Sequence, residues 1–414
     1  MDEAKTLKRN LIYNTVGNVI YFACQWLVTG FFIKVLSPLG AGELNAGYLA
    51  TAMTVTNIFL TLASYGMRTY QVSDVDERYS SGDYIMSRVI TVTAAIALCF
   101  LYSVIVGYAG VQLWCIFLFL LYKLLEAVTD VFHGFCQKHE RMDIIGISYA
   151  VRGILSLVVF CVLFKATGNL NLTLGAMVLL CYAFSAGYDV INTKRFYLPV
   201  KPTDRSSVWR LLYECLPLAV YVFLNTTTAS IPKLFFERMA GTEAMGIYGL
   251  VNSPVLILQV GVAFLFAPFI TTFANKLKDR DYKGFIRLSA FITLGVFAVG
   301  LVGLGGVLLI GKWGLSFLYG SEIAAHSALL VPMVVCTVFT SLALFYCMLL
   351  TVLREMKGLI LSTLFGIVVS LAISVPFISG FSFFGVTYAT IIALVVECVA
   401  LAYFGITSLN KKEK

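Results

Sequence analysis

Long apolar runs alternate with short charged segments along the whole chain of 414 residues. A run of about 20 apolar residues crosses the hydrocarbon core of a bilayer as a helix, and hydropathy predicts twelve such spans. They cover residues 11–35, 44–66, 89–109, 111–131, 144–164, 172–192, 211–231, 247–271, 288–310, 328–350, 358–379 and 384–407. The longest connection, 67–88, is too short for a separate domain. We therefore expect an all-α, polytopic membrane protein with twelve transmembrane helices.

The positive residues predict the orientation of these spans. If the amino end is cytoplasmic, 23 of the 30 Lys and Arg fall in inside segments. Four fall outside, namely Lys165, Lys233, Arg238 and Lys312. Because cytoplasmic loops carry the excess of Lys and Arg, both termini are predicted to be cytoplasmic. The charged amino end has no cleavage signature, so we interpret it as leading into an uncleaved first span.

Composition narrows the classes of function. The chain is 59% hydrophobic and 13% charged, which excludes a water-soluble monomer and a disordered chain. The net charge of +8 falls in juxtamembrane loops, where anionic lipid is a sufficient partner, so no nucleic-acid partner is expected. The ten cysteines form no Cys-x-x-Cys pattern; nine lie in apolar stretches, where buried free thiols are expected, and Cys136 is near a polar loop.

Motifs for enzymes and metals are sparse. Asp74 and Asp76 form the Asp-x-Asp pair of metal-dependent glycosyltransferases, but such a pair is common by chance in a charged loop. His133, Cys136 and His139 have a spacing that suggests metal ligation, although a solvated loop after the fourth span accounts for them better. We expect no enzyme activity, no cofactor and no metal.

A faint internal repeat appears at an offset of two hundred residues, where 40–48 lies over 240–248 with a Glu and a Tyr matched. With six spans in each half, the halves enter the bilayer from the same side and are related by an axis along the membrane normal. We predict two six-helix lobes around a polar cleft: an amino-terminal lobe 1–195, a cytoplasmic linker 196–210 and a carboxy-terminal lobe 211–414.

Ionisable residues inside the membrane are functional candidates, because a charge there is costly unless it faces a cavity or a partner. Lys123, Glu126 and Asp130 follow one another at i, i+3 and i+7, which places them on one helical face. Arg152 lies in the next span. Two interpretations stay open for these four residues. They neutralise one another as a packing network, or they line a transport cavity whose carboxylates exchange protons or cations.

Four further charges are candidates. Glu397 is mid-span with no other charge on its helix, and it is either a protonation switch or a hydrogen-bonded structural carboxyl. Lys34 ends the first span, and Lys233 and Arg238 follow the seventh, the equivalent element of the second half. They either snorkel to the headgroups or form a positive mouth for an anionic substrate.

The residues themselves resemble a family. Leu216-Pro-Leu-Ala-Val, Ile231-Pro-Lys233, Gly246-Ile-Tyr248 and Ala267-Pro268 are similar to the start of the second half in polysaccharide flippases of the multidrug/oligosaccharidyl-lipid/polysaccharide (MOP) superfamily. Weaker likeness lies in 65–74, 130–137, 141–143 and 152–153. The chain lacks the two additional carboxy-terminal spans of the related lipid II flippases, which favours the polysaccharide branch.

This resemblance implies a Wzx-like carrier of the bacterial cytoplasmic membrane. Its substrate would be an undecaprenyl-diphosphate-linked oligosaccharide for capsule, exopolysaccharide or O-antigen, moved by alternating access with a proton or cation gradient. Lys34, Arg68, Lys123 and Arg152 are then candidates for the diphosphate, and Glu126, Asp130 and Glu397 for ion coupling. The expected partners are the lipid-linked oligosaccharide, membrane lipids, and the polymerase and glycosyltransferases of the same pathway.

Two other functions compete with this one. The first is a drug or solute antiporter, from the multidrug branch of the same superfamily or from the major facilitators. The loop after the second span lacks the major-facilitator pattern. The second is a membrane-embedded glycosyltransferase or polysaccharide polymerase, which usually needs a large soluble domain or a long outside loop that this chain does not have.

Overall fold

The structure is a computed structural model that describes residues 2–74, 77–197, 204–266 and 269–413, without the side chains of 2–9, 11, 73, 260–266, 270, 271, 274 and 413. Within these ranges every regular element is a helix. The chain divides into two compact units, Met1–Phe223 and Leu224–Lys414. The expected all-α fold is confirmed.

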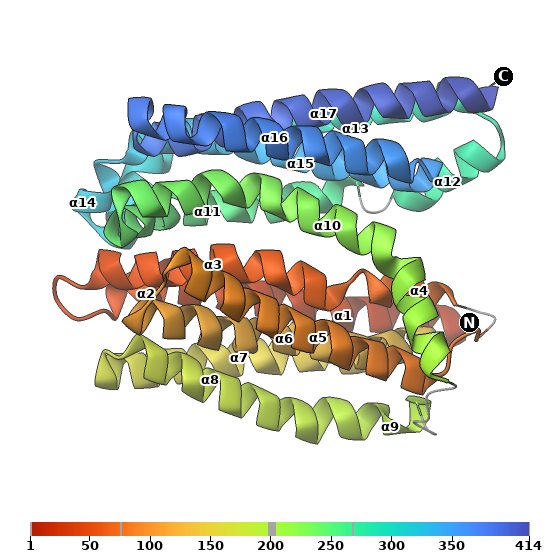
Figure 1. Cartoon of the computed structure of the whole chain (residues 1–414), viewed down its shortest axis with the longest axis horizontal. Helices are drawn as coiled ribbons and strands as arrows, with labels where there is room; N and C mark the ends of the chain where they lie inside the picture. The colour runs from red at the N-terminus through yellow and green to blue at the C-terminus, as the bar shows by residue number, and fades with distance from the viewer. Residues whose placement is uncertain (1, 75–76, 198–203, 267–268, 414) are drawn as a thin grey trace. The chain divides into compact units, whose positions relative to one another are not determined.

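The first unit consists of long helices joined by short turns (Figure 1). Its elements are α1 (Asp2–Trp26), the π-helix η1 (Leu27–Phe32), α2 (Ile33–Val35), α3 (Gly42–Ser64), α4 (Met67–Ser73), α5 (Ser81–Val106), α6 (Gly110–Lys138), α7 (Met142–Thr167), α8 (Leu170–Ser185), the π-helix η2 (Ala186–Val190), α9 (Ile191–Tyr197) and the first part of α10 (Arg205–Ala240).

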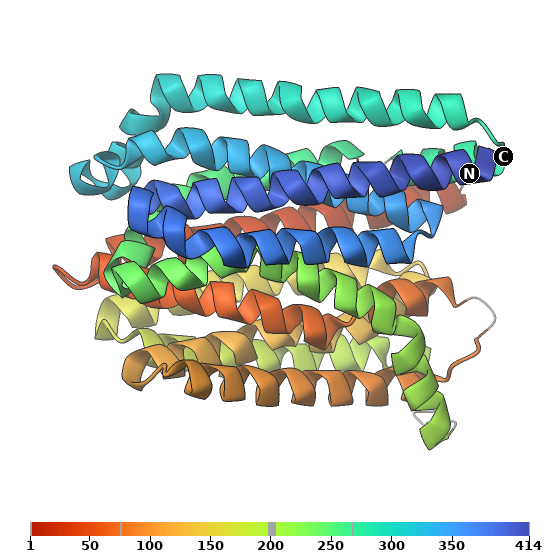
Figure 2. The ribbon, with the colours of Figure 1, turned by 45° about the horizontal axis from the view of Figure 1, so that its top comes forward.

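The second unit begins within α10. It continues with α11 (Thr242–Phe266), α12 (Ile270–Lys278), α13 (Tyr282–Tyr319), α14 (Ser321–Ala324), the 3-10 helix η4 (Ser327–Leu329), α15 (Leu330–Leu353), α16 (Met356–Phe381) and α17 (Phe383–Glu413). Figure 2 shows α13 as one long uninterrupted helix. α3 and α11 begin at Gly42 and Thr242, at the offset of the sequence repeat.

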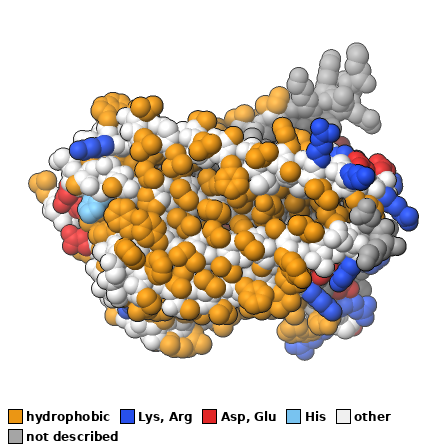
Figure 3. All heavy atoms as spheres, turned by 90° about the horizontal axis from the view of Figure 1, so that it is seen from above, with side chains coloured by type: hydrophobic (Ala, Val, Ile, Leu, Met, Phe, Trp, Pro, Cys, Tyr) orange, Lys and Arg blue, Asp and Glu red, His pale blue; other side chains and the backbone are white. Residues whose placement is uncertain are grey.

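Eleven helices are long and apolar enough to cross a membrane, among the described residues. Each coincides with a predicted span, and the twelfth prediction, 247–271, overlaps α11 and also includes residues outside the described ranges. On the face in Figure 3, hydrophobic side chains cover the middle and Lys and Arg gather toward an end. Leu308 and Leu309 of α13 are 72% and 85% exposed, as expected for side chains in contact with lipid. The count of twelve spans and the cytoplasmic termini stay predictions.

The predicted 67–88 loop is largely helical, which corrects the sequence analysis. α3 ends at Ser64. Tyr65 and Gly66 follow in the left-handed region with φ of 54° and 62°, and α4 begins at Met67. α5 begins at Ser81 with a capping box, in which Ser80 and Asp83 satisfy each other's backbone N–H groups. Because capping anchors a helix start in polar sequence, the helix extends well before its apolar run.

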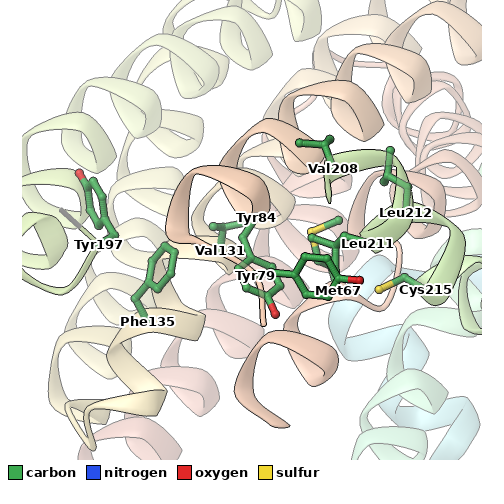
Figure 4. Packing of buried hydrophobic residues seen from close by; sticks show 10 residues of the cluster. All are labelled: Met67, Tyr79, Tyr84, Val131, Phe135, Tyr197, Val208, Leu211, Leu212 and Cys215. Carbon is green, nitrogen blue, oxygen red and sulfur yellow. The ribbon is translucent and has the colours of Figure 1, made fainter. Parts of the chain in front are cut away.

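The start of α10 packs into the first unit. Figure 4 shows the buried cluster to which it contributes, together with α4, α5, α6, α9 and the segment before α5: Met67, Tyr79, Tyr84, Val131, Phe135, Tyr197, Val208, Leu211, Leu212 and Cys215. Tyr70 donates a hydrogen bond to Glu214 of α10. Burial raises the pKa of Tyr79 to about 12, and a hydrogen bond with Glu214 adds to this. Tyr79 is therefore a neutral side chain at physiological pH.

Candidate functional site

The charged residues of α6 lie at the centre of a network within the first unit. We call Arg68, Arg88, Lys123, Glu126, Asp130 and Arg152 the charged cluster. Lys123 Nζ donates to Glu126 Oε1 at 2.5 Å, one helical turn along α6. Tyr21 of α1 donates to the same oxygen at 2.5 Å. Glu126 is therefore held by one cation on its own helix and one hydroxyl from a neighbouring helix.

Arg152 of α7 is buried beside this group. Its Nη1 donates to Thr129 Oγ1 at 3.0 Å, and its guanidinium carbon lies 4.9 Å from the ring centre of Tyr149 and 6.0 Å from that of Tyr21. Such stacking stabilises a guanidinium away from water. Its Nη2 has no hydrogen-bond partner among the described residues. One nitrogen of this buried guanidinium is thus left without an acceptor in the part of the chain that the structure describes.

Asp130 accepts from two arginines on two different helices. Arg88 Nη2 of α5 lies 2.9 Å from Asp130 Oδ2, and Arg68 Nη1 of α4 lies 3.3 Å from Oδ1. Arg68 also donates to Gln137 at 3.1 Å. Arg88 was assigned to a cytoplasmic loop by hydropathy, and that assignment is wrong: its side chain is 4% exposed and also donates to the carbonyls of Ala63 and Ser64. Sequence reasoning missed this residue as part of the site.

Close backbone approach explains why α1 and α7 bring Tyr21 and Arg152 together. A Cβ at Gly17 would overlap the backbone of Gly146, and one at Gly146 would overlap the carbonyl of Tyr13. A Cβ at Gly153 would lie 2.9 Å from the Cα of Tyr21. Glycines permit such helix contacts in membranes. The glycines therefore place the Tyr21 ring within reach of α6 and α7.

The charged cluster has more positive than negative side chains. It contains four cations and two carboxylates. Arg68, Lys123, Glu126 and Asp130 keep between 16% and 27% of their side chains exposed, whereas Arg88 keeps 4%. Arg and Lys bind phosphate oxygens through charge-assisted hydrogen bonds. Chemically, the cluster is suited to an anion that reaches Lys123 and Arg68.

The remaining candidates lie elsewhere. Lys34 forms an ion pair with Glu43 in the first turn of α3. Lys233 and Arg238 lie within α10, not in a loop after it, which corrects the predicted end of the seventh span. Arg238 Nε is 3.7 Å from Glu237, and Lys233 is half-buried. Within the first unit Lys34 pairs with Glu43 and not with the charged cluster, and Lys233 and Arg238 belong to the second unit.

Glu397 is fully buried within the second unit. Neither carboxyl oxygen makes a hydrogen bond of ordinary geometry to a described residue, and Thr363 is its polar neighbour. The carboxyl occupies space left by Gly366, where a Cβ would lie 2.9 Å from Oε2. No ion pair of Glu397 occurs among the described residues.

Two motifs from the sequence have structural explanations. Asp74 accepts the backbone N–H groups of Arg78 and Tyr79 and the hydroxyl of Tyr84, so it organises the turn before α5. Asp76 lies outside the described residues.

His133 and Cys136 are buried in α6, which corrects the predicted solvated loop, whereas His139 is exposed at its end. The described residues contain no group of three side chains suited to a metal ion.

Two cavities of the second unit are apolar. One of about 460 Å³ lies between α13, α15 and α17 and includes Phe285, Tyr346 and Leu401. Another of about 280 Å³ lies between α11, α13 and α15 and includes Pro254, Gly303 and Val334. No charged side chain lines either cavity among the described residues, so neither matches a diphosphate.

Comparisons with known proteins give the family. The family model for polysaccharide biosynthesis proteins matches residues 7–274. Capsular polysaccharide biosynthesis protein CapF of Staphylococcus aureus is 24% identical over 331 residues, which cover 78% of this chain and 80% of CapF. The predicted resemblance is confirmed.

Solved structures agree on the fold. An inward-facing MATE family transporter of the MOP superfamily superposes with a TM-score of 0.71 at 11% identity, over 98% of this chain and 99% of that one. The eukaryotic MATE transporter AtDTX14 gives a TM-score of 0.67 at 15% identity, over 100% and 98%. The chain therefore belongs to the polysaccharide biosynthesis protein family and is a multi-pass membrane protein with the fold of MOP-superfamily transporters.

Proposed function

We propose that this protein is a flippase for undecaprenyl-diphosphate-linked oligosaccharide repeat units, which it moves across the cytoplasmic membrane for capsule, exopolysaccharide or O-antigen synthesis. The observation that carries the proposal is the positive excess of the charged cluster in a member of the polysaccharide biosynthesis family. A lipid-linked diphosphate is an anion that needs such cations, and its polyprenyl tail can stay in the bilayer.

Lys123 and Arg152 are the proposed first contacts of the diphosphate. Lys123 is partly exposed and shares Glu126 with Tyr21, and Arg152 has a buried Nη2 without an acceptor among the described residues. A phosphate oxygen that replaces Glu126 as partner of Lys123 leaves the lysine paired throughout. The exchange therefore avoids the cost of an unpaired buried cation.

The same exchange supplies a physical basis for ion coupling. When the diphosphate takes Lys123, Glu126 loses its cation in a partly buried position. An unpaired carboxylate there is unfavourable, so it gains a proton or a cation from solution. Substrate binding and ion uptake are then linked, because each favours the other. Asp130 is paired with Arg68 and Arg88. If the diphosphate takes one of these arginines, Asp130 gains a proton or a cation in the same way.

The alternative of a drug or solute cation antiporter has support from the MATE-like fold. The net positive charge of the charged cluster opposes the binding of a cationic drug or solute. A cationic drug would meet four positive side chains against two carboxylates, both already paired. Like charges destabilise such a complex. The anionic lipid-linked substrate is therefore the better match.

Translocation in proteoliposomes tests the proposal. We expect the purified protein to move a fluorescent prenyl-diphosphate-linked oligosaccharide between leaflets. The Lys123→Gln variant should bind it at least about tenfold more weakly, because one charge-assisted hydrogen bond contributes roughly 1.5–3 kcal/mol. Lys165→Gln is the matched control, since Lys165 is exposed at the end of α7.

Two results would contradict the proposal. One is the absence of translocation by a folded protein supplied with several glycans. The other is an equal loss of binding in both lysine variants. In cells, deletion should cause lipid-linked repeat units to accumulate on the cytoplasmic leaflet, and normal surface glycan without that pool would count against a flippase.

A further inference from the structure

A buried polar pair of the first unit, His133 with Asp189, lies near the charged cluster. His133 of α6 and Asp189 of η2 are both 0% exposed, and His133 Nε2 lies 3.3 Å from Asp189 Oδ1. Ser185 donates a hydrogen bond to the other carboxyl oxygen. The role proposed for the charged cluster does not use this pair. A buried imidazole with a buried carboxylate therefore needs an explanation of its own.

The backbone around Asp189 is specialised. α8 changes into the five-residue π-helix Ala186–Val190 at this point, and the backbone carbonyl of Asp189 accepts a hydrogen bond from Thr193 at 2.6 Å. Single π-helical turns inside α-helices are rare and occur frequently at functional sites. The π-helical segment contains Asp189 and presents its carboxylate to His133.

His133 has one unused nitrogen. When Nε2 carries the proton donated to Asp189, Nδ1 is a bare acceptor, and it has no hydrogen-bond partner among the described residues. The Tyr149 ring lies edge-on to the imidazole with ring centres 5.2 Å apart. A fully buried acceptor without a donor is unfavourable. One added proton at Nδ1 would turn the pair into an imidazolium and a carboxylate.

The charged groups that face the pair connect it to the cluster. The charged side chains that act on the buried imidazole of His133 are Asp189 of η2, Arg152 of α7 and Arg68 of α4. Tyr149 of α7 also faces it. Arg88 of α5 is engaged with Asp130 on the same helix as His133. Two cations of the charged cluster, Arg68 and Arg152, therefore interact electrostatically with this pair.

We propose that the His133–Asp189 pair is a proton-binding site that controls how tightly the charged cluster binds an anion. With neutral His133 the pair carries one negative charge, which offsets part of the positive excess of the cluster. With a proton on Nδ1 the pair is neutral, and the full excess acts on the anion. Proton and anion then strengthen each other's binding.

A proton is the ligand that the geometry favours over a metal ion. The pair offers one imidazole and one carboxylate, and no third His, Cys, Asp or Glu completes a metal-binding group among the described residues. Histidine changes charge between about pH 5 and 8. The pair therefore suits a proton, which needs only the one unused imidazole nitrogen.

The inference rests on the proposed anionic substrate, so its test has two independent readouts. The first is the affinity of the full chain in lipid nanodiscs for a short-chain prenyl-diphosphate-linked disaccharide. This probe is a diphosphate diester, whose charge stays constant between about pH 5.5 and 8 while histidine titrates. The second is deuterium exchange at the imidazole C2 position, which reports the protonation midpoint of each histidine by mass spectrometry.

Two variants are expected to move the affinity in opposite directions. Wild type should bind the probe roughly fivefold or more tightly at the low end of this pH range. His133→Gln keeps a side-chain donor to Asp189 but cannot charge, so its affinity should lose the tightening that has the His133 midpoint, and only the response of Glu126 and Asp130 should remain. Asp189→Asn removes the negative charge, so its affinity should stay at the tight, low-pH value. His139→Gln, at an exposed position, should behave as wild type.

The outcomes separate the two proposals. A purely structural role would weaken binding in both variants, and it would overturn the inference, as would a wild-type affinity that is independent of pH. A His133 midpoint unaffected by Asp189→Asn would also overturn it. No binding of the probe at any pH would overturn the proposed function and the coupling with it, while the exchange midpoint would still decide whether the pair takes up a proton.

Discussion

At the scale of single residues, the resting partners of a charge decide whether its role is structural. Arg88 donates to Asp130 and to the carbonyls of Ala63 and Ser64, so its guanidinium is committed inside the protein. Lys123 has one ion-pair partner and is partly exposed. A cation that binds and releases an anion must give up its resting partner at low cost. Lys123 meets that requirement and Arg88 does not.

Replacing Arg88 should therefore lower stability more than it changes substrate contacts. Arg88→Gln leaves two carbonyls and part of Asp130 without a charged donor. We expect the free energy of unfolding in detergent to fall by about 2 kcal/mol, less than for a wholly buried pair because Asp130 keeps Arg68.

The control for Arg88→Gln is Arg78→Gln, since Arg78 is exposed. This change should shift the free energy of unfolding by no more than about 0.5 kcal/mol. Equal effects of the two changes on the melting temperature would show that Arg88 has no special structural role.

At the scale of elements, small residues bring together the helices that carry the cluster. α1 and α7 meet at Gly17 and Gly146 with backbone against backbone. This contact places Tyr21 between Glu126 and Arg152. In a bilayer, helix association depends on such close packing, because lipid tails are as apolar as the helices.

Gly146→Ala should disturb this contact. The added methyl group would overlap the Tyr13 carbonyl, and the backbone of α1 must move to accept it. We expect a loss of about 1–3 kcal/mol of stability, with weaker probe binding as Tyr21 shifts. Thermal unfolding and probe affinity measure the two effects.

Gly175→Ala in α8 is the matched change, since a Cβ there meets nothing within 4 Å. It should be neutral or stabilising by up to about 1 kcal/mol, because Ala favours helix over Gly. If Gly146→Ala changes stability as little as Gly175→Ala does, the packing of α1 against α7 does not depend on the close contact at Gly146.

At the scale of the whole molecule, the proposed transport cycle needs energy from an ion gradient. Glu397 is the candidate for this role in the second unit, because it is buried without an ion-pair partner among the described residues. A carboxyl in such a place is stable as the neutral acid and costly as an anion. A conformation that exposed it to water would release its proton.

Glu397→Gln preserves the shape of the neutral acid and removes the proton that it can release. Wild-type proteoliposomes should flip substrate faster when a proton gradient is imposed, and the variant should keep only the rate without a gradient. Glu322→Gln, at an exposed position, should respond as wild type. An unchanged response of Glu397→Gln to both proton and Na⁺ gradients would remove Glu397 from the coupling mechanism.

The elements of this protein could largely be predicted from its sequence. A run of apolar residues long enough to span a bilayer is a local property, so the predicted spans coincide with helices such as α6 and α16. The neighbourhood of Lys123 and Glu126 was also predictable, because i and i+3 positions adjoin on one helix. Helix ends were less accurate, since α5 extends through polar sequence to Ser81.

Only the tertiary structure decided which helices share their charges. Arg88 with Asp130, Tyr21 with Glu126, and His133 with Asp189 join residues far apart in the chain. Spacing along one helix carries no information about which helices pack against it. Hydropathy alone predicts a loop around Arg88 and a solvated segment around His133, whereas both residues are buried in helices. Partner choice depends on helix packing and burial, and these arise only when the whole unit has assembled.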